Sequence, residues 1–225
     1  GKSLNPILKG QISSTVTGMS NGKNGDIWIA TQNNGLVNYA ADETVTFYNT
    51  SNSTIPGNCI YDIETDKEGN LWLACGCSLV KFDGKDFTIY QTDLIEPMNG
   101  MNYILTIMPD ENGTVWVGTK RQGLFKFANG TFTNVDINSV SALTDNYMGF
   151  SMCIDKNGNI WNAGRKELLK IGQDNEWHSL FKLDYIPSSN RIQAVGSDPQ
   201  GYVWVALSMS DTCVVKMSPD GNIIE

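Results

Sequence analysis

Short runs of strand-forming residues alternate with turn residues along the whole chain, and the arrangement recurs. The clearest unit spans residues 58–90, where a run with alternating polar and apolar side chains is followed by three shorter apolar runs. Alternation bounded by turn residues predicts β-strands. The expected strands of this unit are residues 59–65, 71–74, 79–82 and 87–90.

Tryptophan marks the same point of each unit. Five of them stand in the phrase Gly-x-(hydrophobic)-Trp, with gaps of 44, 44, 45 and 43 residues. A period in the forties built from strands is typical of a β-propeller, in which each repeat forms one four-stranded blade. We therefore expect an all-β chain of five four-stranded antiparallel blades. The tryptophans are Trp28, Trp72, Trp116, Trp161 and Trp204.

The repeats occupy nearly the whole chain, which predicts a single propeller domain over residues 1–225 with residues 1–13 as an N-terminal tail or closure segment. A gapped ring would expose two apolar blade faces, so we expect the five blades to close. Part of a larger ring is the alternative. The expected repeats cover about residues 14–48, 58–90, 102–135, 147–180 and 190–225.

The five tryptophans are expected to fill the layer between blades. The side chain two residues after each one is small, and large and small side chains alternate in closely packed layers. A sugar-stacking platform is the alternative, but five equivalent rings favour packing. The small residues are Ala30, Ala74, Gly118, Ala163 and Ala206.

The turn before each tryptophan strand reads Asp-x-x-Gly in four of the five repeats. The aspartate is expected to bond the backbone two residues on, and the glycine to take a positive φ. A repeated calcium site is the alternative, although one carboxylate per turn supplies few of the oxygens that calcium needs. The first repeat departs from the pattern, with Gly22 where aspartate is expected. The four turns are residues 66–69, 110–113, 155–158 and 198–201.

The net charge and the hydropathy of the chain argue against two classes of partner, nucleic acids and the membrane interior. The formal charge is −8 with only 16 Lys and Arg, which argues against nucleic-acid binding. No apolar run approaches 18 residues, so we expect no membrane insertion within the chain. The sequence opens on Gly1 without a methionine, and we expect that a signal segment has been removed.

Five cysteines leave at least one thiol free or paired outside the chain. Cys59 and Cys153 fall on expected inner strands, where they are interpreted as small buried hydrophobic residues. Cys75 and Cys77 lie in one loop, too close for an ordinary zinc pair and without a second pair, which leaves a redox role as the alternative. We expect no metal and no cofactor.

The repeat phrase resembles the two-component regulator propeller repeat. Its closest copy here is Gly113-Thr-Val-Trp-Val-Gly-Thr119 with Gly123-Leu-Phe-Lys-Phe127. In that family the repeats form the extracytoplasmic sensor portion of Bacteroidetes hybrid two-component systems, associated with carbohydrate breakdown products. The resemblance implies a periplasmic or extracellular sensor module and not a catalyst. Such sensors usually carry more repeats and further domains.

A weaker resemblance links residues 198–204 and 215–221 to the streptogramin lyase propellers. Those enzymes use a histidine base and a magnesium ion. The single histidine of this chain, His178, falls on an expected outer strand, away from the axis where a ligand would lie. The resemblance therefore implies the fold without the chemistry.

Propellers bind ligands at the axis, on the face made by the loops that enter the first strand and leave the second strand of each blade. The repeats diverge in these loops, where function usually resides. Amide and phenol groups gather where the inner strands begin, which suits a polyhydroxylated ligand; residues that merely tolerate turn geometry are the alternative. These candidates are Asn58, Asn102, Tyr103, Tyr147 and Asn190.

Basic residues add a charge signal to the same face. They stand at matching loop positions of adjacent blades and at the start of the next inner strand, where they could receive a carboxylate or sulfate. An ordinary solvated rim is the alternative. The candidates are Lys120, Arg121, Arg165 and Arg191.

An enzyme is the third function considered. Only one inner strand carries acids, Asp62 and Glu64, and their spacing places both on one face of that strand. Glycoside hydrolysis needs carboxylates on both sides of the scissile bond. The second acid would come from loop residues Asp93, Glu96, Asp136 or Asp145.

The sequence thus predicts a propeller that recognises a small molecule or oligosaccharide at its loop-rich face, as the sensor module of a two-component system. A protein–protein interaction propeller is the main alternative. A deep polar pocket would favour the small ligand. A flat face with exposed Leu94, Ile95 and Met98 would favour a protein partner.

Overall fold

The computed structural model describes residues 12–100, 102–135, 151–164, 167–172, 177–182, 192–208 and 214–224, with the backbone alone for 177–182. Within these ranges the chain is all-β, and its one helical segment is the 3-10 turn η1, Met98–Gly100. No described helix is long and apolar enough to cross a membrane.

The strands form consecutive antiparallel sheets, each built from neighbouring strands in chain order. Four sheets have four strands and the last has three. The first sheet is β1 (Val16–Asn21), β2 (Ile27–Thr31), β3 (Leu36–Tyr39) and β4 (Val45–Tyr48). The second is β5 (Ile60–Thr65), β6 (Leu71–Cys75), β7 (Ser78–Phe82) and β8 (Phe87–Tyr90).

The remaining sheets repeat this order. The third is β9 (Ile104–Pro109), β10 (Val115–Thr119), β11 (Leu124–Ala128) and β12 (Thr131–Asn134). The fourth is β13 (Ser151–Ile154), β14 (Ile160–Ala163), β15 (Glu167–Ile171) and β16 (Trp177–Lys182). The fifth is β17 (Ile192–Ser197), β18 (Val203–Leu207) and β19 (Val214–Met217).

The strands of the second sheet agree with the sequence prediction to within one residue at each end. The fifth sheet differs, because the residues expected to form its outer strand make only one bridge, between Met217 and Ile223. His178 lies on the outer strand β16, as predicted.

The Asp-x-x-Gly turns form as predicted and also hold the tryptophan. Gly69, Gly113, Gly158 and Gly201 all have positive φ, between 76° and 91°. In the fourth sheet, Asp155 Oδ1 accepts the backbone N–H groups of Asn157 and Asn159 at 2.9 and 3.0 Å. Its other oxygen accepts the indole N–H of Trp161 at 2.9 Å. The same indole bond recurs at 3.0, 3.2 and 2.9 Å in the second, third and fifth sheets.

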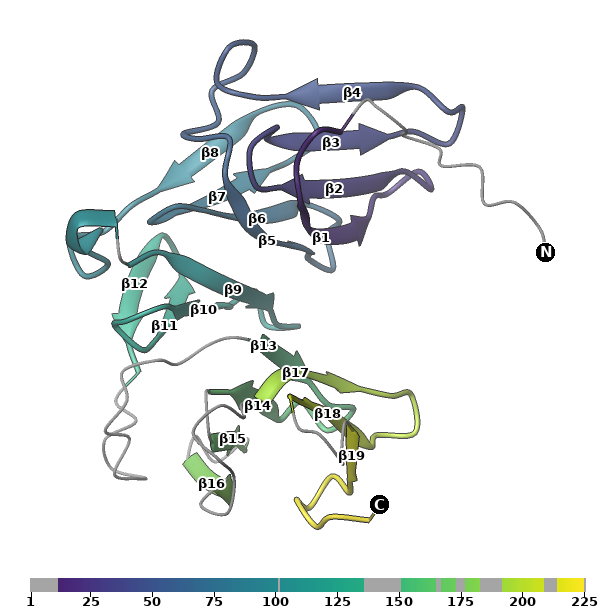
Figure 1. Cartoon of the computed structure of the whole chain (residues 1–225), viewed down its shortest axis with the longest axis vertical. Coiled ribbons are helices and arrows are strands. Elements are labelled where there is room, and N and C mark those ends of the chain that lie inside the picture. The colour runs from purple at the N-terminus through teal and green to yellow at the C-terminus, as the bar shows by residue number, and fades with distance from the viewer. Residues whose placement is uncertain are drawn as a thin grey trace.

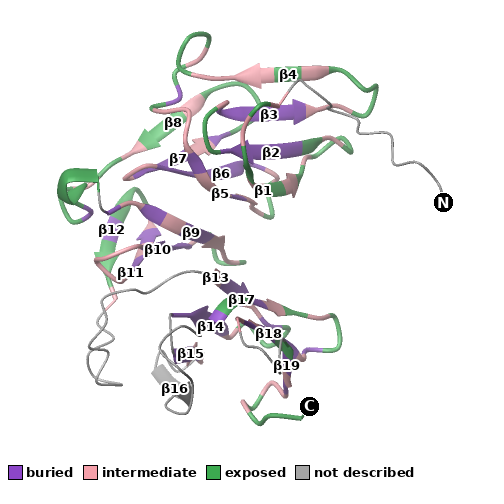
Figure 2. Ribbon diagram, in the orientation of Figure 1, coloured by how far each residue is buried: buried purple, intermediate pink, exposed green. Residues whose placement is uncertain are grey.

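Adjacent sheets pack through two defined faces. The trailing face carries the tryptophan of the second strand and the small residue two positions on. The leading face carries the residues on either side of that tryptophan, which are aliphatic except for Asn162 of the fourth sheet. Trp28 and Ala30 of the first sheet share one core cluster with Leu71 and Leu73 of the second. Equivalent clusters join the second to the third sheet, the third to the fourth and the fourth to the fifth. Figure 2 shows that buried positions concentrate on the middle strands of the sheets.

The prediction that tryptophan packs between sheets is confirmed for the first four and is wrong for the fifth. Trp204 is exposed, and none of the described sheets follows it in the row. The four inter-sheet clusters therefore contain the buried hydrophobic residues of the described chain except Ile29 and Val37, which lie on the leading face of the first sheet.

The first strands of successive sheets are neighbours and are linked by hydrogen bonds. Thr17 Oγ1 donates to the carbonyl of Ile60 at 2.6 Å, and Ser197 Oγ donates to that of Ile154 at 2.7 Å. Figure 1 shows the five sheets following one another along a curved path, with the first and last at its two ends. The expected closure into a five-bladed ring is therefore not supported by this arrangement.

Candidate functional site

The loop face is the end of the sheets where the β4–β5 and β8–β9 connections meet the β2–β3, β6–β7 and β10–β11 loops. Asn58 stands at the first of these junctions. Its Oδ1 accepts the N–H of Thr50 at 2.9 Å, and its carbonyl accepts that of Gly35 at 3.0 Å. The residue thus joins the β4–β5 loop to the β2–β3 loop, so its amide oxygen is engaged in shaping the face.

Asn102 joins the loops of the second and third sheets. Its amide donates to the carbonyl of Glu96 at 2.7 Å and to Oε1 of Gln122, and its Oδ1 accepts the N–H of Arg121 at 3.0 Å. The side chain is only 2% exposed, so it has almost no surface to offer a ligand. Its contacts fix the β8–β9 and β10–β11 loops relative to each other.

Tyr103 is part of an aromatic and cationic stack. Its ring lies parallel to that of Tyr61, with centroids 4.0 Å apart and an interplanar angle of 9°. The Lys120 ammonium group lies 4.8 Å from the Tyr103 centroid, within the range of a cation–π interaction. The Lys120 N–H also donates to the Tyr103 carbonyl at 2.9 Å. Tyr103 and Lys120 are thereby brought together as the sequence predicted, while Tyr61 was missed.

Tyr61 is held in a partly desolvated position by its neighbours. Burial raises the pKa of its phenol, and hydrogen bonding to Cys59 acts in the same direction. The phenol therefore stays protonated and can donate a hydrogen bond. The sequence gave no indication that Tyr61 belongs to the site. Tyr61 stacks on Tyr103 of the next repeat, and the repeat pattern does not show contacts between repeats.

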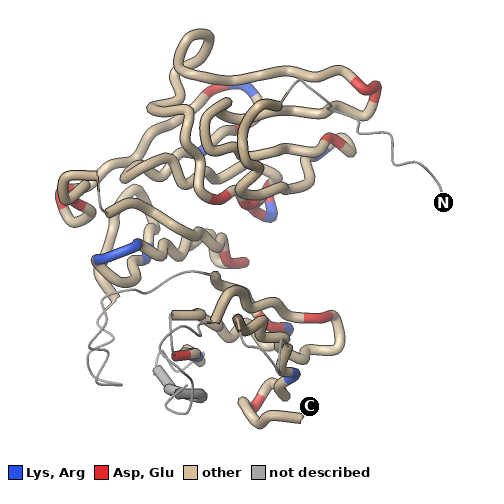
Figure 3. Tube along the Cα trace, viewed as in Figure 1, with Lys and Arg blue, Asp and Glu red and all other residues tan. Residues whose placement is uncertain are grey.

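Half of the predicted cationic sector lies outside the described residues. The structure places Lys120 and Arg121 side by side in the β10–β11 loop, where Arg121 is half-buried and its backbone is bonded to Asn102. Figure 3 shows most acidic and basic positions in the connecting loops rather than in the strands. The candidates Tyr147, Arg165, Asn190 and Arg191 are outside the described ranges.

A cavity of about 530 Å³ opens on the loop face, between the β6–β7 loop and the β8–β9 connection. Its volume lies within the range of small-molecule sites. Gln91 lines it and is positioned by a 2.9 Å bond from Nε2 to Ser78 Oγ. The remaining lining residues are Cys77, Thr92, Asp93, Ile95 and Pro97.

The three apolar side chains that the sequence singled out in the β8–β9 connection do not form one exposed patch. Leu94 and Met98 are exposed, whereas Ile95 is buried against the cavity. Only part of the apolar patch that would mark a protein partner is therefore present. Sequence reasoning named the loop over residues 92–102 but did not single out Thr92 as a candidate contact, and it did not include Gln91.

The two inner-strand acids lie on the trailing face of the second sheet, paired in register with Ala74 and Trp72. Asp62 Oδ2 accepts the N–H of Ile107 on the neighbouring sheet at 2.9 Å, although burial raises the pKa of its carboxyl group. Burial, and secondarily the charge of Asp62, raises the pKa of Glu64 to about 7. Asp62 thus links two sheets.

The described loop acids do not supply an evident catalytic partner for this pair. Asp93 lines the loop-face cavity, and the backbone N–H of Glu96 is bonded to Gln122. Asp136 and Asp145 lie outside the described ranges.

The described cysteines are all free thiols. Burial raises the pKa of Cys75 and of Cys153 to about 12 and also raises that of Cys77. The Cys75 thiol donates to the carbonyl of Gly57 at 3.2 Å, and the Cys77 thiol to that of Asn102 at 3.3 Å. A protonated thiol is a poor nucleophile and metal ligand, so these sulfurs act as packing groups. Among the residues that the structure describes, no cluster of His, Cys, Asp or Glu side chains suits a metal ion.

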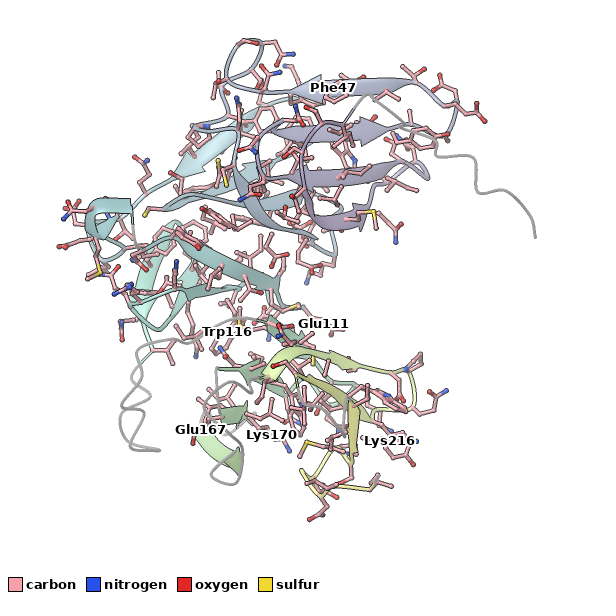
Figure 4. The ribbon with its side chains drawn as sticks, in the orientation of Figure 1. Phe47, Glu111, Trp116, Glu167, Lys170 and Lys216 are labelled. Atoms are coloured by element: carbon pink, nitrogen blue, oxygen red, sulfur yellow. The ribbon has the colours of Figure 1, made fainter. Side chains whose placement is uncertain are left out.

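A second cavity, of about 610 Å³, lies between the third and fourth sheets at the opposite, turn-side end. Glu111 and Trp116 line it, and Figure 4 shows both on the side of the third sheet that faces the fourth. At the neighbouring junctions a lysine occupies the position of Glu111: Lys67 donates to the carbonyl of Glu111, and Lys156 to that of Gln200 at 2.6 Å. Glu111 cannot donate such a bond from its side chain, and the cavity lies at this junction, between the third and fourth sheets.

Comparison with known proteins gives two kinds of result. Residues 54–76 and 99–121 match the family described as "Two component regulator propeller". No curated protein sequence matches the chain. The matched segments run through the second and third sheets and contain the stacked residues Tyr61, Tyr103 and Lys120, whereas the residues that line the loop-face cavity lie outside them.

Solved structures share the fold at low sequence identity. Streptogramin B lyase is 20% identical, with a TM-score of 0.72 over 92% of this chain and 65% of the lyase chain. An extracellular domain assigned to a hybrid two component system of B. thetaiotaomicron is 22% identical, with a TM-score of 0.72 over 92% of this chain and 28% of that one.

The extracellular domain assigned to a one component system of the same organism is 16% identical, with a TM-score of 0.73 over 96% of this chain and 28% of that one. This chain therefore spans less than two thirds of the lyase and under a third of either sensor domain. These likenesses establish a propeller-like fold, and the sequence matches show that the chain carries two-component regulator propeller repeats.

Proposed function

We propose that the chain is part of an extracytoplasmic sensor propeller of a two-component regulatory system, with the loop face as its ligand-recognition surface. The family match and the two extracellular sensor neighbours support this assignment. Its role is to bind and not to catalyse. The periplasm or the cell exterior is the compartment that follows from it.

The observation that carries the proposal is the polar cavity beside the Tyr61–Tyr103–Lys120 stack. Asn102 connects the two features, because it directly precedes Tyr103 and its carbonyl accepts the thiol of Cys77 in the cavity wall. Gln91, Thr92 and Asp93 offer amide, hydroxyl and carboxylate groups, which together recognise hydroxyl groups. A carbohydrate or a similar polyhydroxylated molecule is the ligand class that this chemistry fits.

Lys120 and Arg121 add selectivity for an anionic ligand. Both follow β10 on the loop that Asn102 fixes, so their positive charges are held at the rim of the face. A uronic or sulfated oligosaccharide would gain charge-assisted hydrogen bonds from them. Arg165 and Arg191 are assigned to the same sector by the sequence pattern alone, since both lie outside the described ranges.

A protein partner is the second candidate, favoured by exposed Leu94 and Met98 on the β8–β9 loop. The two candidates predict different effects of substitution. A small ligand depends on Asp93 and Lys120, while a protein partner depends on Leu94 and Met98.

A thermal-shift screen against neutral, uronic and sulfated oligosaccharides tests the proposal, because a ligand that binds only the folded state raises the melting temperature. Calorimetry on any hit should show weaker binding for Asp93→Ala and for Lys120→Ala. Lys85→Ala is the matched control, since Lys85 is exposed in the β7–β8 turn away from the loop face. Equal loss in the control, or no hit in the panel, would count against a carbohydrate sensor.

A further inference from the structure

A lysine links the turn before one tryptophan strand to the corresponding turn of the next sheet. Lys67, at the second position of its turn, donates from its ammonium group to the carbonyl of Glu111. Lys156 stands at the same position two sheets later and donates to the carbonyl of Gln200 at 2.6 Å. Both acceptors belong to the following turn, so each ammonium group ties two sheets together.

The aliphatic part of this lysine lies against the turn glycine of the next sheet. A Cβ atom built on Gly69 would overlap side-chain carbons of Lys23, and one built on Gly201 would overlap those of Lys156. The glycine thus leaves room for the lysine stem. A lysine therefore crosses three of the four junctions, those between the first and second, the second and third, and the fourth and fifth sheets.

The junction between the third and fourth sheets is the exception. Glu111 stands at the second turn position of the third sheet, where the other three junctions have lysine. The cavity of about 610 Å³ lies at this junction, and its volume is within the range of small-molecule sites. Its walls combine turn residues of both sheets with side chains of the core. The core side chains are Trp116, Ile160 and Ile171.

The cavity has acceptors placed where the other junctions bind an ammonium group. The carbonyls that accept lysine belong to the second turn position, as in Glu111, or to the third, as in Gln200. In the turn of the fourth sheet these positions are Lys156 and Asn157, and both line the cavity. Glu111 adds a carboxylate from the opposite turn. The Lys156 ammonium group is bonded to Gln200, so it is engaged at the next junction.

Lys126 also lies beside a lining residue of this cavity, but it has a different role. Its ammonium group lies 4.5 Å from the centroid of the Trp116 ring. Lys81 and Lys170 lie 5.4 Å from the tryptophan rings of the second and fourth sheets, and both of those sheets also carry the turn lysine. The lysine over the ring and the lysine of the turn therefore occur together, and one does not replace the other.

We propose that this cavity binds a primary aliphatic amine, whose ammonium group takes the position that a lysine ammonium group has at the other junctions. The amine would donate to the carbonyls of Lys156 and Asn157 and to the carboxylate of Glu111, and its chain would lie against Trp116 and Ile160. Such an amine is protonated at pH 7, as lysine is, and gains charge-assisted hydrogen bonds. The site lies at the opposite end of the sheets from the loop face and does not depend on the ligand proposed there.

Titration of the ¹⁵N-labelled protein with pentylamine tests the proposal, because this molecule has the chain and the ammonium group of a lysine side chain. The indole N–H signal of Trp116, assigned with Trp116→Phe, should move along a saturable curve. The indole signal of Trp72, at a junction that already has its lysine, should stay in place. Pentanol has the same chain without the charge and should move neither signal.

Two variants of Glu111 test the position of the ammonium group. Glu111→Lys supplies the ammonium group from the chain itself, so it should melt at a higher temperature than the wild type and should no longer respond to pentylamine. Glu111→Gln removes the carboxylate and should raise the dissociation constant several-fold. Glu68→Gln is the matched control, because Glu68 is an exposed turn residue of the second sheet, and it should bind as the wild type does.

The proposal is overturned if pentylamine leaves the Trp116 signal in place, if pentanol moves it equally, or if Glu111→Lys responds as the wild type does. Glu111→Gln changes only the charge of an exposed side chain, so it provides the test if Glu111→Lys does not fold. Equal loss of affinity in Glu111→Gln and Glu68→Gln would also overturn it, since the amine would then be held by the net charge of the protein.

Discussion

The indole N–H of Trp161 donates a 2.9 Å hydrogen bond to Oδ2 of Asp155, six residues earlier in the chain. The turn before the strand and the large side chain on it are therefore one unit. Oδ1 of the same carboxylate binds backbone N–H groups that shape the turn. Formation of the turn thus fixes the position of the indole between the sheets. This explains why the aspartate of the turn and the tryptophan of the strand recur together in the repeats.

Replacing Asp155 with alanine should destabilise the protein by about 2–4 kcal/mol, because several buried N–H groups lose their acceptor at once. Asp155 and Trp161 are both buried, so water cannot replace the bond without opening the junction. Urea unfolding of the two proteins measures the loss.

Asp198→Ala is the matched comparison, since Asp198 makes the same bond to an exposed tryptophan. That hydrogen bond from Trp204 holds the pKa of Asp198 below its usual range, but solvent reaches the site and the loss should be smaller. Equal losses for the two variants would show that burial does not set the strength of this unit.

Replacing Asn162 with valine should stabilise the protein by about 1–3 kcal/mol, because it removes a buried amide that lacks partners. Asn162 is fully buried on the leading face of the fourth sheet, and neither of its side-chain polar atoms is hydrogen-bonded. The equivalent residues of the other sheets are aliphatic: Ile29, Leu73, Val117 and Val205.

Asn102→Val is the control with the opposite sign. Asn102 is also buried, but its amide is bonded to Glu96, Gln122 and Arg121. Its replacement should cost about 2–4 kcal/mol, because three polar groups lose a partner. A gain for Asn102→Val, or a loss for Asn162→Val, would contradict the assignment of these two amides.

Strand positions could be predicted from the sequence because they follow from local alternation and turn chemistry, both visible within one repeat. The bond between Asp155 and Trp161 was missed, since turn rules consider only what an aspartate does to the backbone. Asn102 was predicted as a ligand contact on its position alone. Its burial depends on the loops around residues 96 and 122, which meet it only in the folded chain.

The larger difference between the sequence prediction and the structure concerns the closure of the five sheets into a ring. The sequence shows five similar repeats and gives equal weight to their tryptophans, but burial of each depends on the sheet that follows it. Trp204 stands in the same Asp-x-x-Gly-x-(hydrophobic)-Trp pattern as Trp161 and has a different environment.

The thiols of Cys75 and Cys153 should resist alkylation in the folded protein at pH 8. Burial raises the pKa of both to about 12, so the reactive thiolate is scarce and is also shielded. Mass spectrometry after a brief iodoacetamide treatment should find both unmodified without denaturant and both modified in urea. Rapid labelling of Cys75 in the folded state would instead support the redox interpretation of the Cys75–Cys77 loop.

Glu64 should make the stability of the protein fall as the pH rises from about 4.5 to about 7, and Asp62, whose carboxyl pKa burial also raises, should act in the same direction. The pKa of Glu64 is raised from an ordinary value of 4.5 to about 7 by burial, so in this window the folded state binds a proton that the unfolded state has released. Proton binding to the folded state stabilises it at low pH, and that contribution, about 3 kcal/mol, is gone above pH 7.

Glu64→Gln keeps the shape of the side chain but cannot ionise, so urea unfolding should show the stability of the variant rising relative to that of the wild type between pH 5 and pH 8. Glu68→Gln, at an exposed turn position, should run parallel to the wild type. A Glu64→Gln profile that stays at a constant distance from the wild type would mean that this carboxyl group titrates alike in both states, and the buried acid pair would then not be a source of pH dependence.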